Sequence, residues 1–312
     1  MLCLLGPTAA GKTVLGIELA KALNGEIISA DSMQVYRGMD IGTAKPTTEE
    51  RKNIHHHLID IRNPDESWTV SDFIEEAQSA KLKIQNKGKV PIMVGGTGLY
   101  INAWLNGFSF PPAAEDKEIR KRLESFPAPI LYSRLSTVDS LAATKIHPNN
   151  KKRLIRALEV YEITGKPISE LQKHRMEPKT KSLGSISNEE PRISFAGSEH
   201  TLIGLNLPRD LLYQRINQRV DEMIAKGLIN EVSGLLKQGY NRQLRSMQAL
   251  GYKEVIDYLD GKWTRDEMTI ELKKRTRHFA RRQLTWFRRF TEVKWFEPSV
   301  DIASILRYIK TI

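Results

Sequence analysis

Short apolar runs alternate with amphipathic stretches through much of the chain. The runs with the length and composition of buried strands are residues 2–5, 26–30, 90–94 and 202–207. Apolar positions at helical spacing follow the first of them, and again occupy residues 71–86. Strands that alternate with helices in this way predict an α/β core, in which helices flank a parallel sheet.

The middle of the chain has a different character, because Pro111 and Pro112 break the pattern and helical periodicity follows. Residues 116–124 and 150–164 are expected to be helices, and the second sets four basic residues against an apolar face. We therefore predict two domains. The α/β core comprises residues 1–111 and 197–312, and a mainly helical insertion domain comprises residues 112–196.

Thr264 and Glu267 form a capping-box pattern that predicts the start of a long helix, ending near residue 290. This stretch holds nine Lys and Arg residues but only three acids, and aromatic residues lie among them. Basic and aromatic side chains together suit a nucleic acid, because phosphates bind cations and unstacked bases stack on rings. The alternative is a solvated basic face over an apolar packing stripe, and for the aromatic residues both interpretations stay open.

The residues between the first strand and the first helix fit the phosphate-binding pattern G-x-x-x-x-G-K-[ST], the P-loop. They are Gly6, Pro7, Thr8, Ala9, Ala10, Gly11, Lys12 and Thr13. In such a loop successive backbone N–H groups point into one concavity, and the next helix adds the positive end of its dipole. Lys12 would contact phosphate oxygens, and the Thr13 hydroxyl would ligate Mg²⁺. The pattern predicts a P-loop NTPase-like core that binds phosphates, with ATP or another nucleotide as a possible ligand and Mg²⁺ as cofactor.

Two further candidates follow predicted strands. Asp31 comes directly after residues 26–30, and ligands of open parallel sheets bind beyond the carboxyl ends of the strands. Its carboxylate is a candidate general base or substrate acceptor, and the alternative is an aspartate that caps a turn. The strand at 90–94 leads into Gly95-Gly96-Thr97, where many P-loop NTPases carry a Mg²⁺-binding Asp. This departure weakens a nucleotide-hydrolysis interpretation and leaves the Thr97 hydroxyl as a hydrogen-bond donor.

Composition narrows the class of partner. The 312 residues carry a formal net charge of +11, which favours a polyanionic partner over plain solubility. A single cysteine excludes an internal disulfide framework and suits the cytoplasm, and no apolar run has the length of a membrane span. The run His55-His56-His57 has no cysteine or i,i+4 histidine beside it, so we interpret it as a loop or as the entry to a strand at 58–61 rather than a metal site.

Several stretches together resemble the tRNA dimethylallyltransferases, also called tRNA isopentenylpyrophosphate transferases. They are GPTAAGKT at 6–13, GEIISADSMQVYRGMDIGTAKP at 25–46, VGGTGLY at 94–100, IHPNNKKRLIRALEVYEITGKP at 146–167, LPRDLLYQRINQRVDEMI at 207–224, MQALGYKE at 247–254 and RRQLTWFRR at 281–289. They span nearly the whole chain in the family's order, and the second is far more specific than a P-loop.

The resemblance implies transfer of a dimethylallyl group from its pyrophosphate to N6 of adenosine 37, in tRNAs that read codons beginning with U. The P-loop would hold the pyrophosphate with Mg²⁺, Arg219 would be a second cation on it, and Thr97 a donor nearby. Asp31 would accept the N6 proton. The anticodon stem-loop would be bound by Asp31, Ser32, Met33, Gln34, Thr97, Arg120, Lys152, Arg153, Arg156, Gln248, Gly251, Tyr252, Lys253, Arg281, Arg282, Gln283, Thr285, Trp286 and Arg288. The expected enzyme is a monomer.

Two other functions remain as alternatives. In a P-loop small-molecule kinase, Asp31 would orient a substrate hydroxyl towards the γ-phosphate of ATP, but the basic insertion argues against a small acceptor. In a non-catalytic RNA-binding protein the P-loop would be vestigial, and the intact Lys12 and Thr13 argue against that.

Overall fold

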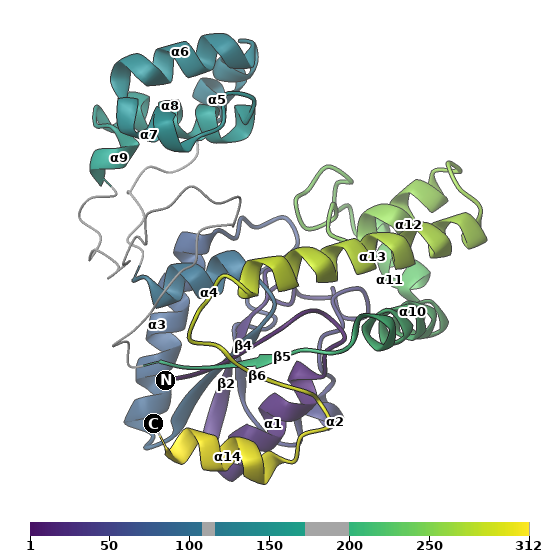
Figure 1. The fold of residues 1–312 in the computed structure, drawn as a ribbon. Helices are drawn as coiled ribbons and strands as arrows, with labels where there is room; N and C mark the ends of the chain where they lie inside the picture. The colour runs from purple at the N-terminus through teal and green to yellow at the C-terminus, as the bar shows by residue number, and fades with distance from the viewer. Residues whose placement is uncertain (108–115, 172–199, 312) are drawn as a thin grey trace. The chain divides into compact units, whose positions relative to one another are not determined.

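The structure is a computed structural model that describes residues 1–107, 116–171 and 200–311 (Figure 1). The chain divides into two compact units. The first combines Met1–Leu105 with Lys179–Ile312, and the second is Asn106–Pro178. The domain boundaries predicted at 111/112 and 196/197 lie outside the described residues.

A six-stranded parallel sheet forms the centre of the first unit, with strand order β3-β2-β4-β1-β5-β6. The strands are β1 (Leu2–Leu5), β2 (Gly25–Ala30), β3 (His56–His57), β4 (Val90–Gly95), β5 (Thr201–Leu205) and β6 (Lys294–Phe296). The predicted α/β fold with a parallel sheet is confirmed. The strand predicted at 58–61 is wrong, because Leu58 and Asp60 adopt positive φ values of 63° and 57° and the extended backbone ends at His57.

The described part of this unit also contains helices, and some of them cover the two faces of the sheet. They are α1 (Lys12–Ala22), α2 (Thr48–Arg51), α3 (Val70–Asn86), α4 (Gly98–Leu105), α10 (Arg209–Ala225), α11 (Leu228–Lys237), α12 (Tyr252–Leu259), α13 (Arg265–Phe287) and α14 (Ile302–Lys310). Successive residues of a strand point to opposite faces. Cys3 and Leu5 of β1 therefore join one apolar core with α3 and α4, while Leu2 and Leu4 join a second with α1 and α14 (Figure 1).

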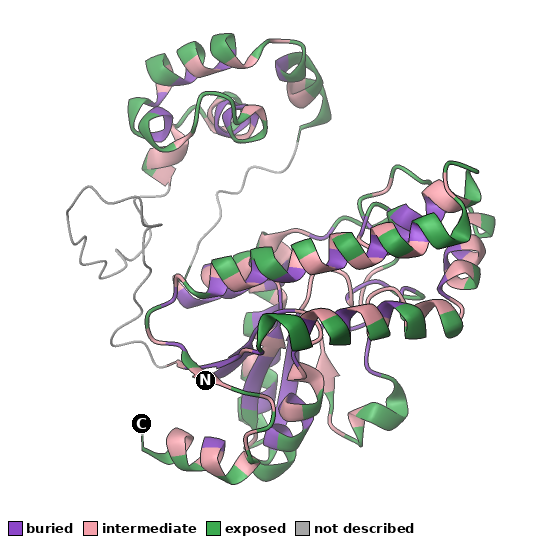
Figure 2. Ribbon diagram, turned by 45° about the vertical axis from the view of Figure 1, so that its right-hand side comes forward, coloured by how far each residue is buried: buried purple, intermediate pink, exposed green. Residues whose placement is uncertain are grey.

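The long helix α13 begins as the capping pattern predicts. The Thr264 hydroxyl accepts a hydrogen bond from the Glu267 N–H, and the Glu267 carboxylate accepts one from the Thr264 N–H. Its buried positions recur along one side, which Figure 2 shows as a broken stripe between exposed turns. Within the described ranges, no helix combines the length and apolar character needed to cross a membrane.

The second unit is mainly helical, as predicted. It contains α5 (Lys117–Glu124), α6 (Ala128–Val138), α7 (Ser140–Lys145), α8 (Lys151–Thr164) and α9 (Ile168–Leu171). Leu131 and Leu135 of α6 pack with Leu154 and Leu158 of α8 in a separate small core. The two predicted helices of this region are confirmed to within one residue at their starts.

Candidate active site

The register of three adjacent strands brings the predicted site residues to one edge of the sheet. Gly95 at the end of β4 is the register partner of Leu5 in β1 and of Ala30 in β2. The next residue of each strand therefore begins a loop at the same level. These loops carry the P-loop, Asp31 and Thr97, so the topology assembles at one edge the groups that the sequence analysis placed there.

The P-loop runs directly into α1, and its cationic side chain is folded back on it. Lys12 Nζ donates a hydrogen bond to the Pro7 carbonyl at 2.6 Å. Arg219 on α10 reaches the same loop, where its Nη1 donates to Thr8 Oγ1 at 3.0 Å. Burial and the neighbouring Arg219 lower the pKa of Lys12 to about 7, against an opposing effect of Asp31. Two basic side chains therefore contact the same loop, an arrangement that suits the phosphates of a ligand.

Asp31 caps a turn with one of its two carboxylate oxygens. Oδ1 accepts hydrogen bonds from the backbone N–H groups of Met33 at 2.8 Å and Gln34 at 3.3 Å. The turn-capping alternative is therefore realised, but among the described residues it involves Oδ1 only, so Oδ2 can take a second role. Thr97 lies beside this turn, since its hydroxyl accepts a hydrogen bond from the Ser32 N–H at 3.1 Å.

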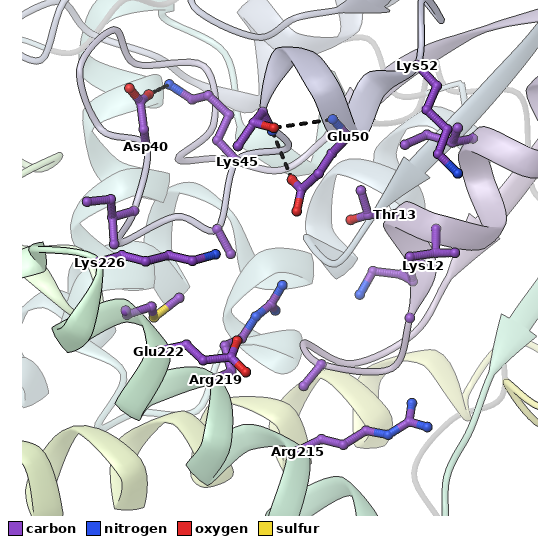
Figure 3. A pocket seen from close by; sticks show the side chains of 18 residues that line it. Lys12, Thr13, Asp40, Lys45, Glu50, Lys52, Arg215, Arg219, Glu222 and Lys226 are labelled. Carbon is purple, nitrogen blue, oxygen red and sulfur yellow. Dashed lines mark hydrogen bonds and ion pairs between the residues drawn. The ribbon is translucent and has the colours of Figure 1, made fainter.

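Two cavities meet at the P-loop. One has a volume of about 480 Å³ and the other about 580 Å³. Both are lined by Lys12, Thr13 and Arg219, but only the larger is lined by Asp31 and Thr97. Figure 3 shows the smaller cavity, where the labelled basic side chains come from α1, α10 and the segment around α2. The arrangement suits an anion at the junction and an acceptor group in the larger cavity.

Known proteins resemble this chain over most of its length. A family model described as IPP transferase matches residues 34–290. This chain belongs to the IPP transferase family. The tRNA dimethylallyltransferase of Pelotomaculum thermopropionicum is 45% identical over 300 residues, which cover 95% of this chain and 90% of that protein. That of Carboxydothermus hydrogenoformans is 48% identical over 305 residues, covering 96% and 93%.

Solved structures give the same relationship. The full-length tRNA isopentenylpyrophosphate transferase of Bacillus halodurans has a TM-score of 0.70 and 43% identity, with 99% of this chain and 94% of that chain covered. A eukaryotic dimethylallyltransferase acting on tRNA has a TM-score of 0.80 at 28% identity, with coverage of 99% and 77%. This chain therefore shares the fold of the solved tRNA isopentenylpyrophosphate transferases.

The structure places many of the RNA-binding candidates of this IPP transferase around the larger cavity. Its lining includes Ser32, Met33, Gln34, Gln248, Gly251, Lys253, Arg282 and Gln283. Arg281, Thr285 and Arg288 are exposed on the same helix as Arg282, and Trp286 is half-buried. These assignments stay predictions, although their common location around one cavity is consistent with a single bound RNA.

Two of the RNA-binding candidates are engaged inside the protein. Tyr252 is fully buried, and its hydroxyl donates to Glu231 Oε1 at 2.6 Å. Gln283 is 7% exposed, and both ends of its amide bind backbone groups, at Thr8 and Gly96. The polar ends of both side chains therefore make hydrogen bonds within the protein. Among the aromatic residues of α13 and its end, Phe287 and Phe290 belong to the core, which settles the packing alternative for these two.

The second unit carries the other four RNA-binding candidates. Lys152 and Arg153 are exposed at the start of α8. Arg120 forms two hydrogen bonds to the buried carboxylate of Glu159, at 2.8 and 3.0 Å, and Arg156 forms one at 2.7 Å. These cations lower the pKa of Glu159 in spite of its burial, and they are held in fixed positions by it.

A cluster of possible metal ligands lies away from both cavities. The ligand atoms of Glu26, His55 and His57 lie within 4.8 Å of one another, a grouping that the sequence analysis missed because Glu26 belongs to another strand. The Glu26 carboxylate already accepts hydrogen bonds from His57 at 2.8 Å and from Lys87 and Lys89 at 3.2 and 2.9 Å. Two ammonium groups against the one carboxylate favour an ion network around the buried Glu26 over a metal site.

Proposed function

We propose that this IPP transferase moves the dimethylallyl group of dimethylallyl pyrophosphate to N6 of adenosine 37, in tRNAs that read codons beginning with U. The products are N6-dimethylallyladenosine and pyrophosphate. The observation that carries this proposal is the pair of cavities that meet at Lys12, Thr13 and Arg219, with Asp31 and Thr97 in one of them only. The names of the relatives, tRNA dimethylallyltransferases, support the same reaction.

The pyrophosphate would lie at the junction of the cavities. As the bond between the allylic carbon and the pyrophosphate oxygen breaks, negative charge grows on that oxygen. Lys12 and Arg219 both hydrogen-bond to the P-loop, so these two basic groups lie close to where the leaving group would bind and their charges would stabilise it. The Thr97 hydroxyl would add a hydrogen bond in the larger cavity.

Mg²⁺ fits this site as a partner of the pyrophosphate. Thr13 offers a hydroxyl beside Lys12, and Mg²⁺ commonly takes few protein ligands together with phosphate oxygens and waters. Within the described ranges no group of three carboxylates or histidines lies at the P-loop, so an all-protein cage is not offered there. Bound in this way, the ion would neutralise charge on the pyrophosphate.

The acceptor base would enter the larger cavity. A base inside the anticodon loop must leave its stack to reach this depth, so the nucleotide is extruded. The N6 lone pair attacks the allylic carbon, the carbon–oxygen bond breaks, and the N6 proton passes to the free Oδ2 of Asp31. An exocyclic adenine amine is a weak nucleophile, so alignment at near-attack distance carries much of the rate.

The deciding experiment mixes the protein with Mg²⁺, dimethylallyl pyrophosphate and an unmodified anticodon stem-loop with adenosines at 36, 37 and 38. Mass spectrometry of the RNA should show one added C5H8 unit, confined to position 37. A stem-loop with guanosine at 37 is the matched control and should stay unmodified. Binding without transfer would point to a non-catalytic RNA-binding protein, and ATP turnover with a small acceptor would point to a kinase. A monomeric enzyme working in the cytoplasm completes the proposal.

A further inference from the structure

Glu231, in the first turn of α11, accepts hydrogen bonds from three consecutive backbone N–H groups of a distant segment. Its Oε2 accepts from Asp40 at 3.0 Å and Ile41 at 2.7 Å, and its Oε1 accepts from Gly42 at 3.1 Å. Successive N–H groups that converge on one anion form the kind of nest that binds phosphate elsewhere. Here a carboxylate of the protein fills the nest, and it ties the segment to α11.

Tyr252 holds the same segment from a second side. Its hydroxyl donates to Glu231 Oε1 at 2.6 Å, and burial together with the Glu231 charge raises the pKa of Tyr252, so it stays a donor. Its ring also lies against Gly42, where an added Cβ would be 2.4 Å from a ring carbon. Only glycine allows this approach. The carboxylate and the ring therefore clamp the turn at residues 40–42.

The clamped turn belongs to a segment, residues 40–44, that separates the two cavities. Asp40 and Ile41 line the smaller cavity, Gly42 and Thr43 line the larger one, and Ala44 lines both. Glu231 and Tyr252 line neither cavity, so Glu231 would influence substrates through the groups that it holds, and residues 40–42 take three of its hydrogen bonds.

The segment is also joined to the turn that carries Asp31. The amide nitrogen of Gln34 donates to the carbonyls of Thr43 at 3.4 Å and Ala44 at 3.5 Å. The backbone N–H of Gln34 in turn donates to Asp31 Oδ1 at 3.3 Å. A shift of residues 40–44 would therefore change the lining of the smaller cavity, which Lys12 shares. It would also disturb the hydrogen bonds around Asp31.

We propose that Glu231 is a positioning residue for prenyl transfer. Glu231 and Tyr252 hold residues 40–42 in place. Residues 40–44 line both cavities, so this fixes the surfaces on which the pyrophosphate and the acceptor base are aligned. This inference rests on the proposed function. Loss of the clamp should lower the rate of the chemical step, because small misplacements of reacting groups are costly, while the affinity for tRNA is left unchanged.

The test is Glu231→Gln, which keeps the size of the side chain but puts an NH₂ donor where an acceptor is needed. The single-turnover rate with saturating dimethylallyl pyrophosphate and stem-loop should fall about tenfold or more, with an unchanged dissociation constant for the stem-loop. Glu26→Gln is the matched control. It removes another carboxylate held by several hydrogen bonds, and Glu26 lines neither cavity. It should lower the unfolding temperature but keep the rate per folded enzyme.

A second measurement does not depend on activity. Hydrogen exchange of the amides of residues 40–42 should be faster in Glu231→Gln than in the wild type, and intermediate in Tyr252→Phe, which loses only the hydroxyl. Wild-type exchange in both variants, or a Glu231→Gln rate within twofold of the wild type, would overturn the proposal. If the wild-type enzyme itself transfers no prenyl group, the proposed function fails, and the exchange data still decide whether Glu231 holds the segment.

Discussion

The backbone N–H of Thr8, in the P-loop, donates a hydrogen bond of 2.8 Å to the amide oxygen of Gln283, near the C-terminal end of α13. The amide nitrogen of the same side chain donates to the Gly96 carbonyl at 2.9 Å. Gly96 follows β4, and a Cβ there would lie 2.4 Å from that nitrogen, so the contact requires glycine. One buried side chain therefore couples the phosphate-binding loop, the loop after β4 and the basic helix.

The first prediction concerns this coupling. Gln283→Glu keeps an acceptor for Thr8 but places a second carboxylate oxygen against the Gly96 carbonyl and adds negative charge beside the P-loop. We expect the KM for dimethylallyl pyrophosphate to rise about tenfold, the effect of one lost buried hydrogen bond. Gln85→Glu, an exposed change of the same charge on α3, is the control. An unchanged donor KM would show that Gln283 does not shape the P-loop.

The second prediction separates the two roles of Asp31. Asp31→Asn keeps an oxygen that can accept from Met33 and Gln34, but the new amide cannot take a proton from N6. We expect the single-turnover rate to fall about 10²-fold or more, as is usual for loss of a general base. The dissociation constant of the stem-loop should stay close to that of the wild type. A near-wild-type rate would remove Asp31 from the chemistry and leave it as a turn cap.

Parts of the site could be predicted from sequence, because they follow from local order along the chain. The P-loop, Asp31 and Thr97 each come directly after an apolar run, and a parallel sheet brings such positions to one edge. Glu231 and the Thr8 contact of Gln283 could not be predicted in this way. Their hydrogen bonds join residues 191 and 275 positions apart, and no periodic pattern marks an acid in the first turn of a helix as a ligand for a distant backbone.

The error at residues 58–61 has a physical cause of the same kind. The apolar run suggests a strand, but Asp60 is drawn to Lys45, whose ammonium group lies 2.5 Å from both Asp60 and Asp40. Lys45 is buried at 8% exposure, so it needs these carboxylates. The backbone turns at Leu58 and Asp60 to supply one of them. A tertiary ion pair thus overrides a local preference for the extended conformation.

The third prediction concerns the ion network at Glu26. Burial alone would raise the pKa of Glu26, but hydrogen bonds from Lys89, His57 and Lys87 lower it to about 2. The unfolded chain has the ordinary value of 4.5, so this stabilisation is complete above pH 4.5 and is lost as the pH falls towards 2. Denaturant titrations at pH 3 to 7 should show Glu26→Gln less stable than the wild type, with a difference that shrinks below pH 4.5. A constant difference would exclude the network as its source.

The fourth prediction uses the exposed cations of α13. Replacing Arg281 and Arg282 together by Ala should weaken stem-loop binding and reduce the slope of log K against log salt by about 2, roughly one unit for each lost phosphate contact. Lys21→Ala with Lys310→Ala is the matched control, since it removes the same charge from exposed positions on α1 and α14. Equal slopes in the two double variants would place the RNA footprint elsewhere.

The fifth prediction follows from the lowered pKa of Lys12. With a pKa of about 7 in the free enzyme, Lys12 is largely neutral at pH 8, whereas a bound pyrophosphate favours its charged form. Binding of inorganic pyrophosphate at pH 8 should therefore take up a proton, which calorimetry in buffers of different ionisation enthalpy measures directly. The free energy of unfolding of the free enzyme should rise between pH 7 and 10.5, because only the unfolded chain keeps the Lys12 proton in that range.

The control for the binding measurement is Lys12→Arg, which stays charged throughout. It should lose the proton uptake assigned to Lys12 while sharing any titration of the pyrophosphate itself. Equal proton uptake by the two enzymes would mean that Lys12 is already protonated before the anion arrives.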